Sequence, residues 1–187
     1  MEQLRRRQQA DKILYDSGLF AWLENIGEPH VIGSYRMGMM AWNDLDIDIV
    51  NERMDTDRLY SLTAFVLEQF CPLWYEAKEE VNDEGKTVWF HGFHTRIDGE
   101  LWNVDLWFFD RETIRKAETY CDRISEQVRQ IPGSRERIIR MKQELLERNL
   151  YGFYKYSSMD VYRAVLEQGI SDVEELLRRY QRGENRI

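Results

Sequence analysis

Aspartates alternate with apolar residues from Asp44 to Val50, and this period of two predicts a strand with one polar and one buried face. Asp44, Asp46 and Asp48 fall on the polar face. Aspartate is rare in strands, and like charges on one face repel each other unless a cation neutralises them. The pattern indicates either a cation site or, as the plainer alternative, an edge strand whose acidic face lies in water.

The spacing of apolar residues elsewhere predicts helices and strands in the order of an α/β protein. Before residue 44 the predicted elements are a helix over 2–25 that can break at Gly18, a strand over 30–32 and a short helix starting at Ser34. After residue 50 they are a helix over 55–70 and strands over 73–81, 87–97 and 101–109. Short turns join the last three strands, which predicts an antiparallel meander.

The chain changes character near residue 110, and we place a boundary there between residues 1–110 and 111–187. The first part has a net charge of −11 and contains all six tryptophans, whereas the second has a net charge of +3 and helical spacing throughout. We therefore expect a core of strands and helices followed by a helical C-terminal portion.

Composition argues against several classes of protein. The 187 residues are 43% hydrophobic, enough to bury a core. No apolar run reaches the roughly 20 residues that a membrane span needs, and the first residues lack the apolar stretch of a secretory signal, so a cytoplasmic protein is expected. The net charge of −8 argues against a protein that coats DNA or RNA, so the expected partner is a small molecule rather than a nucleic acid.

Several known motifs contain two aspartates separated by one residue, and their surroundings distinguish them. An EF-hand loop is excluded because its glycine is absent and apolar residues fill the intervening positions. A sugar-nucleotide transferase remains an alternative, because such enzymes also bind a metal through this motif. That alternative does not explain the Gly-Ser turn before Asp44. Gly33 lets the chain turn tightly, and Ser34 can offer its hydroxyl and nearby backbone N–H groups to a phosphate. Together the motifs predict a site for a phosphate and a hard cation such as Mg²⁺.

Gly33-Ser34, nine further residues and then Asp44-Leu45-Asp46 resemble the signature of the DNA polymerase β-like nucleotidyltransferase superfamily. In that superfamily a third carboxylate comes from a later strand with apolar flanks, and the resemblance places it at Asp105. The resemblance covers residues 30–110 and implies an α/β fold, in which a small mixed sheet is flanked by helices.

The resemblance also implies a reaction. Asp44, Asp46 and Asp105 are expected to be the catalytic carboxylates and to hold two Mg²⁺ ions, while Gly33 and Ser34 bind a nucleoside triphosphate. A nucleoside monophosphate then passes to a hydroxyl group of the acceptor, and pyrophosphate leaves. In size and layout the chain resembles the minimal bacterial enzymes that modify antibiotics such as lincosamides or aminoglycosides, which implies a small-molecule acceptor.

Two further residues are candidate nucleotide ligands, and each has an alternative. Arg36 lies two residues after Ser34, where it is either a phosphate ligand or an ordinary surface arginine. Helical regions of the superfamily often supply a lysine to the triphosphate, and Lys155 fits that role, although a simple turn with Ser158 as the helix cap is the alternative. Asp48 stays outside the predicted ligand set.

Other charged and titratable residues have plainer interpretations. His91 and His94 are an odd number of positions apart on a predicted strand, so they should face opposite sides of the sheet. The run from Arg5 to Arg7 is expected to be a solvated helix face. For the whole protein, the alternatives are a nucleotide-binding module without turnover and transfer to a protein or nucleic-acid acceptor.

Overall fold

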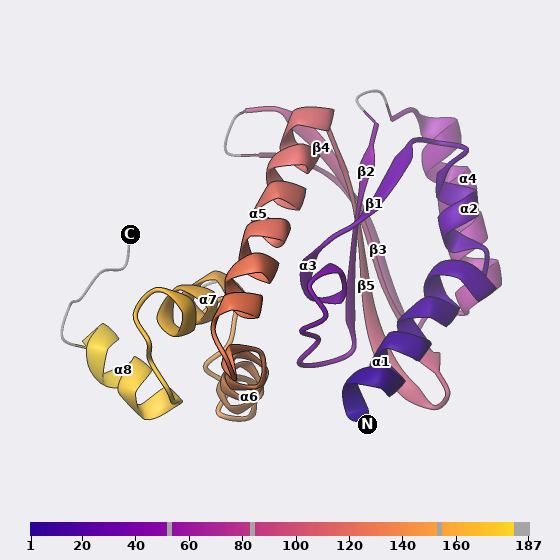
Figure 1. The fold of residues 1–187 in the computed structure, drawn as a ribbon. Coiled ribbons are helices and arrows are strands. Elements are labelled where there is room, and N and C mark those ends of the chain that lie inside the picture. The colour runs from indigo at the N-terminus through magenta and orange to yellow at the C-terminus, as the bar shows by residue number, and fades with distance from the viewer. Residues whose placement is uncertain (52–53, 83–84, 153–154, 182–187) are drawn as a thin grey trace. The chain divides into compact units, whose positions relative to one another are not determined.

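The computed structural model describes residues 1–51, 54–82, 85–152 and 155–181 (Figure 1). Its centre is a five-stranded mixed sheet in the order β1-β2-β5-β4-β3. The strands are β1 (Glu28–Val31), β2 (Asp44–Val50), β3 (Trp74–Val81), β4 (Thr87–Ile97) and β5 (Glu100–Phe109). Strands β3, β4 and β5 form the predicted antiparallel meander, and β5 pairs with β2 in parallel. The predicted α/β fold with a small mixed sheet is confirmed.

Helices account for most of the remaining chain. The first unit has α1 (Glu2–Asp11), the π-helix η1 (Lys12–Asp16), α2 (Leu19–Leu23), α3 (Gly33–Arg36) and α4 (Thr56–Phe70). The C-terminal part has α5 (Arg111–Gln130), α6 (Ser134–Glu147), α7 (Ser158–Leu166) and α8 (Val173–Gln181). The break predicted at Gly18 is present, because this glycine has φ +79° and separates η1 from α2. Among the described residues, no helix has the length and apolar character needed to cross a bilayer.

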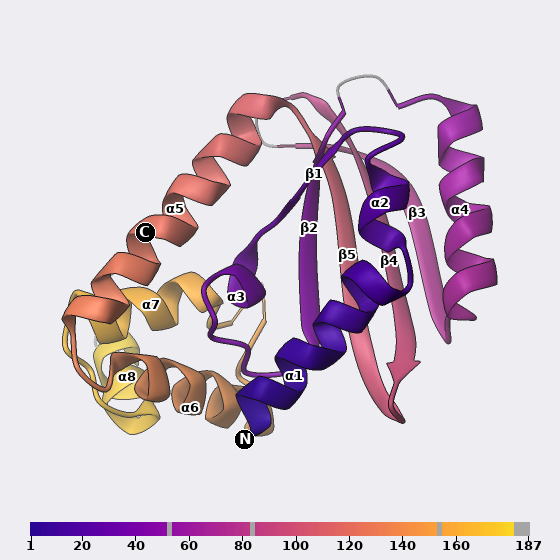
Figure 2. The same cartoon turned by 45° about the vertical axis from the view of Figure 1, so that its right-hand side comes forward.

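One face of the sheet is buried under α1, α2 and α4, as both ribbon views show (Figures 1 and 2). Leu45, Ile47 and Ile49 of β2 point into this layer and are fully buried. They belong to one apolar core with residues from all three helices and from β4 and β5. The alternation in β2 leaves its aspartates on the opposite face.

Two differences from the predicted helices have clear local causes. The helix predicted to start at Ser34 is only the four-residue α3, because Gly38 adopts φ +64° and ends the helical path. The segment that follows returns to the start of β2, and Arg6 helps to fix it there. The guanidinium of Arg6 donates to the backbone oxygen of Met40 and to the side chain of Asn43, both at 3.3 Å. The prediction that Arg5 to Arg7 form a solvated face is therefore wrong for Arg6, which is only 8% exposed.

The chain divides into two compact units, Met1–Cys121 and Asp122–Ile187, and the division falls inside α5. In the second unit, α7 begins with a capping box. The hydroxyl of Ser157 accepts from the backbone N–H of Asp160, and the carboxylate of Asp160 accepts from the backbone N–H of Ser157. The helix cap is therefore Ser157 and not Ser158, one residue earlier than predicted.

His91 and His94 face opposite sides of the sheet, as predicted. His91 is fully buried in the core, where its Nδ1 lies 2.8 Å from the hydroxyl of Tyr75. That hydroxyl is also 2.7 Å from the side chain of Thr63. The other ring nitrogen of His91 is buried and has no hydrogen-bond partner among the described residues. Burial lowers the pKa of His91 to about 4, because the surroundings disfavour the charged ring.

His91 is expected to make the fold sensitive to acid. Its pKa in the unfolded chain is near 6.5, so its contribution to stability is fully present above that pH and is lost as pH falls towards 4. From the shift, this loss amounts to about 3 kcal/mol. Urea unfolding of the metal-free protein between pH 7.5 and 4.5 checks it, with His91→Gln as the neutral comparison. If both proteins lose stability equally over this range, His91 is not the acid-sensitive group.

Candidate active site

Three carboxylates meet on the open face of the sheet, the one opposite the apolar core. Asp44, Asp46 and Asp105 each place one carboxylate oxygen within 4.8 Å of the others. The parallel pairing of β2 with β5 brings this about, because Asp46 stands opposite Asp105 and Asp44 stands opposite Asn103. The predicted carboxylates are thus brought together from two strands that lie far apart in the sequence.

The electrostatics of this cluster favour a cation. Burial raises the pKa of Asp105 to about 6, and the neighbouring carboxylate of Asp44 adds to the rise. The side-chain amide of Asn103 donates to Asp44 at 2.8 Å and holds one of the three carboxylates in place. A set made only of carboxylate oxygens, partly buried and mutually repelling, fits a hard divalent ion such as Mg²⁺. The sequence interpretation did not single out Asn103, although its position two residues before Asp105 predicts the same strand face.

Gly33 packs directly against this cluster. It adopts φ +62°, and a Cβ atom at this position would lie 2.1 Å from Oδ2 of Asp46. The preceding residue, Ile32, donates its backbone N–H to the backbone oxygen of Asp46 at 3.1 Å. The turn therefore needs glycine for two reasons, its backbone conformation and the close approach of a carboxylate. Only the first reason was visible in the sequence.

Ser34 and Arg36 follow Gly33 in α3. Ser34 is buried, and its backbone oxygen accepts from Met39 at 2.9 Å. The guanidinium of Arg36 donates to Glu118 of α5 at 2.9 Å, and the same carboxylate oxygen lies 3.1 Å from Nδ1 of His30. A phosphate that bound Arg36 would therefore compete with Glu118. No sequence pattern points to Glu118, because its contacts with Arg36 and His30 depend on the packing of distant segments.

Asp48 continues the polar face of β2 but lies outside the carboxylate cluster found among the described residues. It is buried opposite His30 of β1. Burial raises its pKa to about 7, and the charge of Glu118 adds to the rise. This position agrees with leaving Asp48 out of the predicted ligand set.

Lys155 belongs to the second unit, and its contacts are made there. Its ammonium donates to the backbone oxygen of Asn149 and lies 3.3 Å from the side-chain oxygen of the same residue. Asn149 follows α6 in the left-handed conformation, with φ +54°. These contacts join Lys155 to the residue that follows α6.

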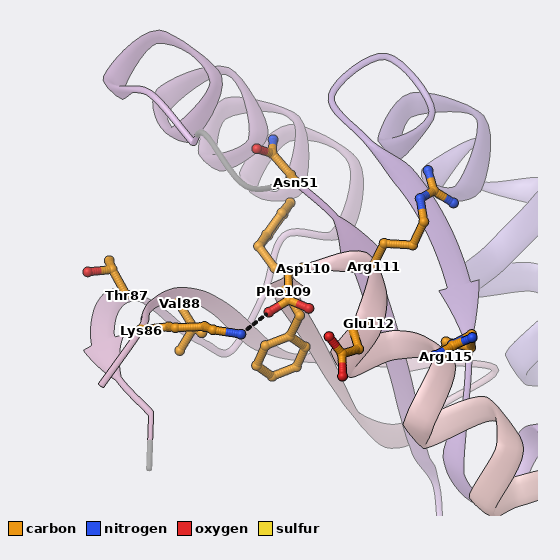
Figure 3. Close-up of a pocket in the computed structure, with 10 residues that line it drawn as sticks. Asn51, Lys86, Thr87, Val88, Phe109, Asp110, Arg111, Glu112 and Arg115 are labelled. Atoms are coloured by element: carbon orange, nitrogen blue, oxygen red, sulfur yellow. Dashed lines mark hydrogen bonds and ion pairs between the residues drawn. The ribbon is translucent and has the colours of Figure 1, made fainter. Parts of the chain in front are cut away.

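A hollow of about 910 Å³ lies at the other end of β2 and β5, where Asn51 and Asp110 follow the two strands (Figure 3). In Figure 3 the ammonium of Lys86 points towards Asp110, and the two groups are 2.9 Å apart. Asp110 also accepts from the backbone of Thr113, and these contacts lower its pKa to about 2. Arg111, at the rim, pairs with Glu28 at 2.7 Å. Lys86 and Arg111 at this hollow thus each form an ion pair with a carboxylate of the protein. None of the residues predicted for the nucleotide or metal site is among those that line the hollow.

Comparisons with known proteins gave matches by structure alone. No family model matches the sequence, and no curated protein matches it. A poly(A) polymerase complex of GLD-2 with GLD-3 has a TM-score of 0.55 at 16% identity, covering 88% of this chain and 52% of that chain. Cid1 poly(U) polymerase with bound MgGTP has a TM-score of 0.52 at 15% identity, covering 87% and 50%. A cytoplasmic RNA terminal U-transferase has a TM-score of 0.50 at 16% identity, covering 87% and 47%.

This chain therefore spans about half the length of the structures that it matches. At such low identity the likeness concerns the fold. It agrees with the mixed α/β architecture of this chain. The chain shares its fold with these polymerase structures, which agrees with the α/β fold implied by the resemblance of its Gly-Ser and Asp-Leu-Asp motifs.

Proposed function

We propose that the protein is a metal-dependent nucleotidyltransferase, which moves a nucleoside monophosphate from a nucleoside triphosphate to a hydroxyl group of a small-molecule acceptor. One observation carries this proposal: Asp44, Asp46 and Asp105 converge within 4.8 Å beside the Gly33 turn. The charge of the first part of the chain, −11 over residues 1–110, favours a neutral or cationic acceptor over a polyanion.

Each residue of the site has a proposed task. Asp44, Asp46 and Asp105 hold the divalent ions, while Asn103 orients Asp44. Bound Mg²⁺, as two ions, would neutralise phosphate charge and make the acceptor hydroxyl easier to deprotonate. The acceptor oxygen forms a bond to the α-phosphorus, the bond from that phosphorus to the bridging oxygen breaks, and pyrophosphate leaves with the electron pair. The hydroxyl proton is lost to solvent.

The outer phosphates are proposed to bind at the Gly33–Ser34 turn. Ser34 lies next to the glycine that touches Asp46, so a triphosphate whose metal is held by Asp46 reaches this turn. Arg36 is proposed as an additional phosphate ligand, which exchanges its contact with Glu118 for one with phosphate.

An RNA 3′ end is a second candidate acceptor. The similar structures are those of an RNA terminal U-transferase, a poly(A) polymerase and a poly(U) polymerase. These likenesses do not support the expectation of a small-molecule partner in preference to a nucleic acid. They also do not support a specific relation to the antibiotic-modifying enzymes. Transfer to an antibiotic is therefore proposed from the sequence resemblance alone.

Pyrophosphate release tests the proposal. The protein is incubated with Mg²⁺ and each of the four ribonucleoside triphosphates, against aminoglycosides, lincosamides, simple alcohols and a short oligoadenylate. Release that requires a small-molecule acceptor supports the proposal, whereas release that requires the oligoadenylate supports the second candidate. Triphosphate binding without any release indicates a binding module, and a nucleoside diphosphate product indicates a sugar-nucleotide transferase.

Ser34→Ala is expected to weaken triphosphate binding about tenfold, because a hydrogen bond to a charged phosphate is lost. Fluorescence titration with a labelled ATP analogue in Mg²⁺ measures the affinity. Ser61→Ala is the matched control, since Ser61 lies on α4 and its hydroxyl donates to Arg58 within that helix. An affinity equal to that of the control would remove Ser34 from the proposed phosphate site.

A further inference from the structure

A row of residues crosses the open face of the sheet from the carboxylates to its outer edge. Strand pairing places Asp46 opposite Asp105, Asp105 opposite Gly92, and Gly92 opposite Glu76. Neighbouring strands lie about 4.8 Å apart, so Gly92 is one strand away from Asp105. The row therefore continues the proposed catalytic site across β4 to β3.

The space above Gly92 is occupied by aromatic rings. A Cβ atom at Gly92 would lie 2.4 Å from the ring of Phe90 and 3.1 Å from the ring of Trp74. Phe90 is buried beneath this surface, with Trp107 at 4.5 Å between ring centroids. The indole of Trp74 thus lies above Gly92, which is the residue paired with Asp105 on the neighbouring strand.

Trp74 is both fixed and accessible. Its ring packs against the imidazole of His94, opposite it on β4, with 4.7 Å between the ring centroids and 39° between the planes. Even so, 40% of Trp74 remains exposed, an unusual amount for the largest apolar side chain. An indole held from one side and open on the other is a surface on which a ring can stack.

The charges near Trp74 favour a ligand ring that carries a positive charge. Glu76 and Glu80 share a single lysine, with Lys78 at 3.4 Å from the first and 2.5 Å from the second, so this edge of the sheet keeps a net negative charge. The carboxylates at the other end of the row are balanced by Mg²⁺ in the proposed reaction, and those ions are balanced in turn by the triphosphate. A protonated amine is attracted both by Glu76 and by the face of an indole.

We propose that Trp74, supported by His94 and with Glu76 beside it, is the acceptor subsite, and that its ligand is a cationic, ring-containing small molecule with a free hydroxyl. The ring stacks on Trp74, an amine lies near Glu76, and the hydroxyl points along the row towards Asp105. This inference rests on the proposed function, because it takes the carboxylate cluster as the place of transfer.

Direct binding tests the subsite independently of turnover. Neomycin, a polycationic ring compound, and a ten-nucleotide oligoadenylate are each titrated calorimetrically into the protein with Mg²⁺ and a non-hydrolysable ATP analogue. Trp74→Ala is expected to weaken neomycin binding about tenfold or more, and Trp74→Phe to retain most of it. Glu76→Gln is expected to weaken it several-fold and to reduce its dependence on salt.

Tyr60→Ala is the matched control, because Tyr60 is a 67% exposed aromatic residue on α4, which covers the opposite face of the sheet. Melting temperatures and affinities for the ATP analogue should be the same in all variants. Neomycin affinity that is absent, or unchanged by Trp74→Ala, overturns the subsite even if an acceptor-dependent release of pyrophosphate is found. Oligoadenylate binding that is lost in Trp74→Ala while neomycin does not bind overturns its assignment to a cationic small molecule. Binding of neomycin at Trp74 without release of pyrophosphate would leave the subsite standing and count against the proposed transfer.

Discussion

Replacing Asp46 with asparagine is expected to lower nucleotidyl transfer by a factor on the order of 10³ or more, with little effect on the fold. Asp46 is the carboxylate that contacts both the Gly33 turn and the cluster with Asp44 and Asp105. Under the proposed function, the loss of its charge removes a metal ligand that lies against the Gly33 turn, and metal stabilisation of the transferring phosphoryl group contributes several kcal/mol. The measurement is the rate of pyrophosphate release at saturating Mg²⁺ and triphosphate.

Asp48→Asn is the matched control for this experiment. Asp48 lies two residues further along the same face of β2, but it is buried and lies outside the carboxylate cluster found among the described residues. It should retain most of the activity, while Asp46→Asn loses it. Equal rates in the two variants would show that the cluster is not the site of transfer. Circular dichroism melts of both variants establish that the fold is intact.

Gly33→Ala is expected to reduce transfer by a factor on the order of 100 and to weaken binding of a divalent ion. The new methyl group would lie 2.1 Å from Oδ2 of Asp46, so either the turn or the carboxylate must move. Because the residue also needs φ +62°, the variant should be less stable by more than the about 1 to 2 kcal/mol that a left-handed backbone costs an alanine. Ion affinity is measured by Mn²⁺ titration and stability by urea unfolding.

Gly99→Ala separates the two effects. Gly99 lies between β4 and β5 with φ +84°, but a Cβ there meets nothing within 4 Å. This variant therefore carries the backbone strain without the clash, and it should lose stability while keeping its Mn²⁺ affinity and activity. If Gly33→Ala and Gly99→Ala have the same stability, Mn²⁺ affinity and activity, the close approach of Gly33 to Asp46 does not contribute to function.

Much of the fold could be predicted because local pattern and tertiary structure agree. The alternation in β2 has a period of two, and the structure uses it directly: Leu45, Ile47 and Ile49 are buried while Asp44 and Asp46 stay on the open face. Asp55 caps α4 through the backbone N–H of Arg58 at 2.8 Å, as expected of an aspartate before a helical run. The antiparallel meander of β3, β4 and β5 was also predictable, because its strands follow one another along the chain and short turns join them.

Features that depend on packing between distant segments could not be predicted. Arg6 looked like one of three solvated arginines, but the return of residues 37–43 towards β2 gives its guanidinium buried acceptors. Trp74 had no local signal either, because its proposed role depends on Gly92 of a different strand and on the register that places Gly92 opposite Asp105. The sequence predicted which carboxylates meet, and the fold determines what surrounds them.

The parallel pairing of β2 with β5 has a consequence for how the protein folds. Asp46 and Asp105 are 59 positions apart, and the chain between their strands forms α4, β3 and β4 before it reaches β5. A slip of one residue in that pairing would turn Asp105 into the apolar core and Leu106 out of it. The β2–β5 pairing is the strand pairing of this sheet with the longest sequence separation, and such pairings form late because a long loop must close first. Ion affinity at the proposed site therefore reports that this pairing is complete and in register.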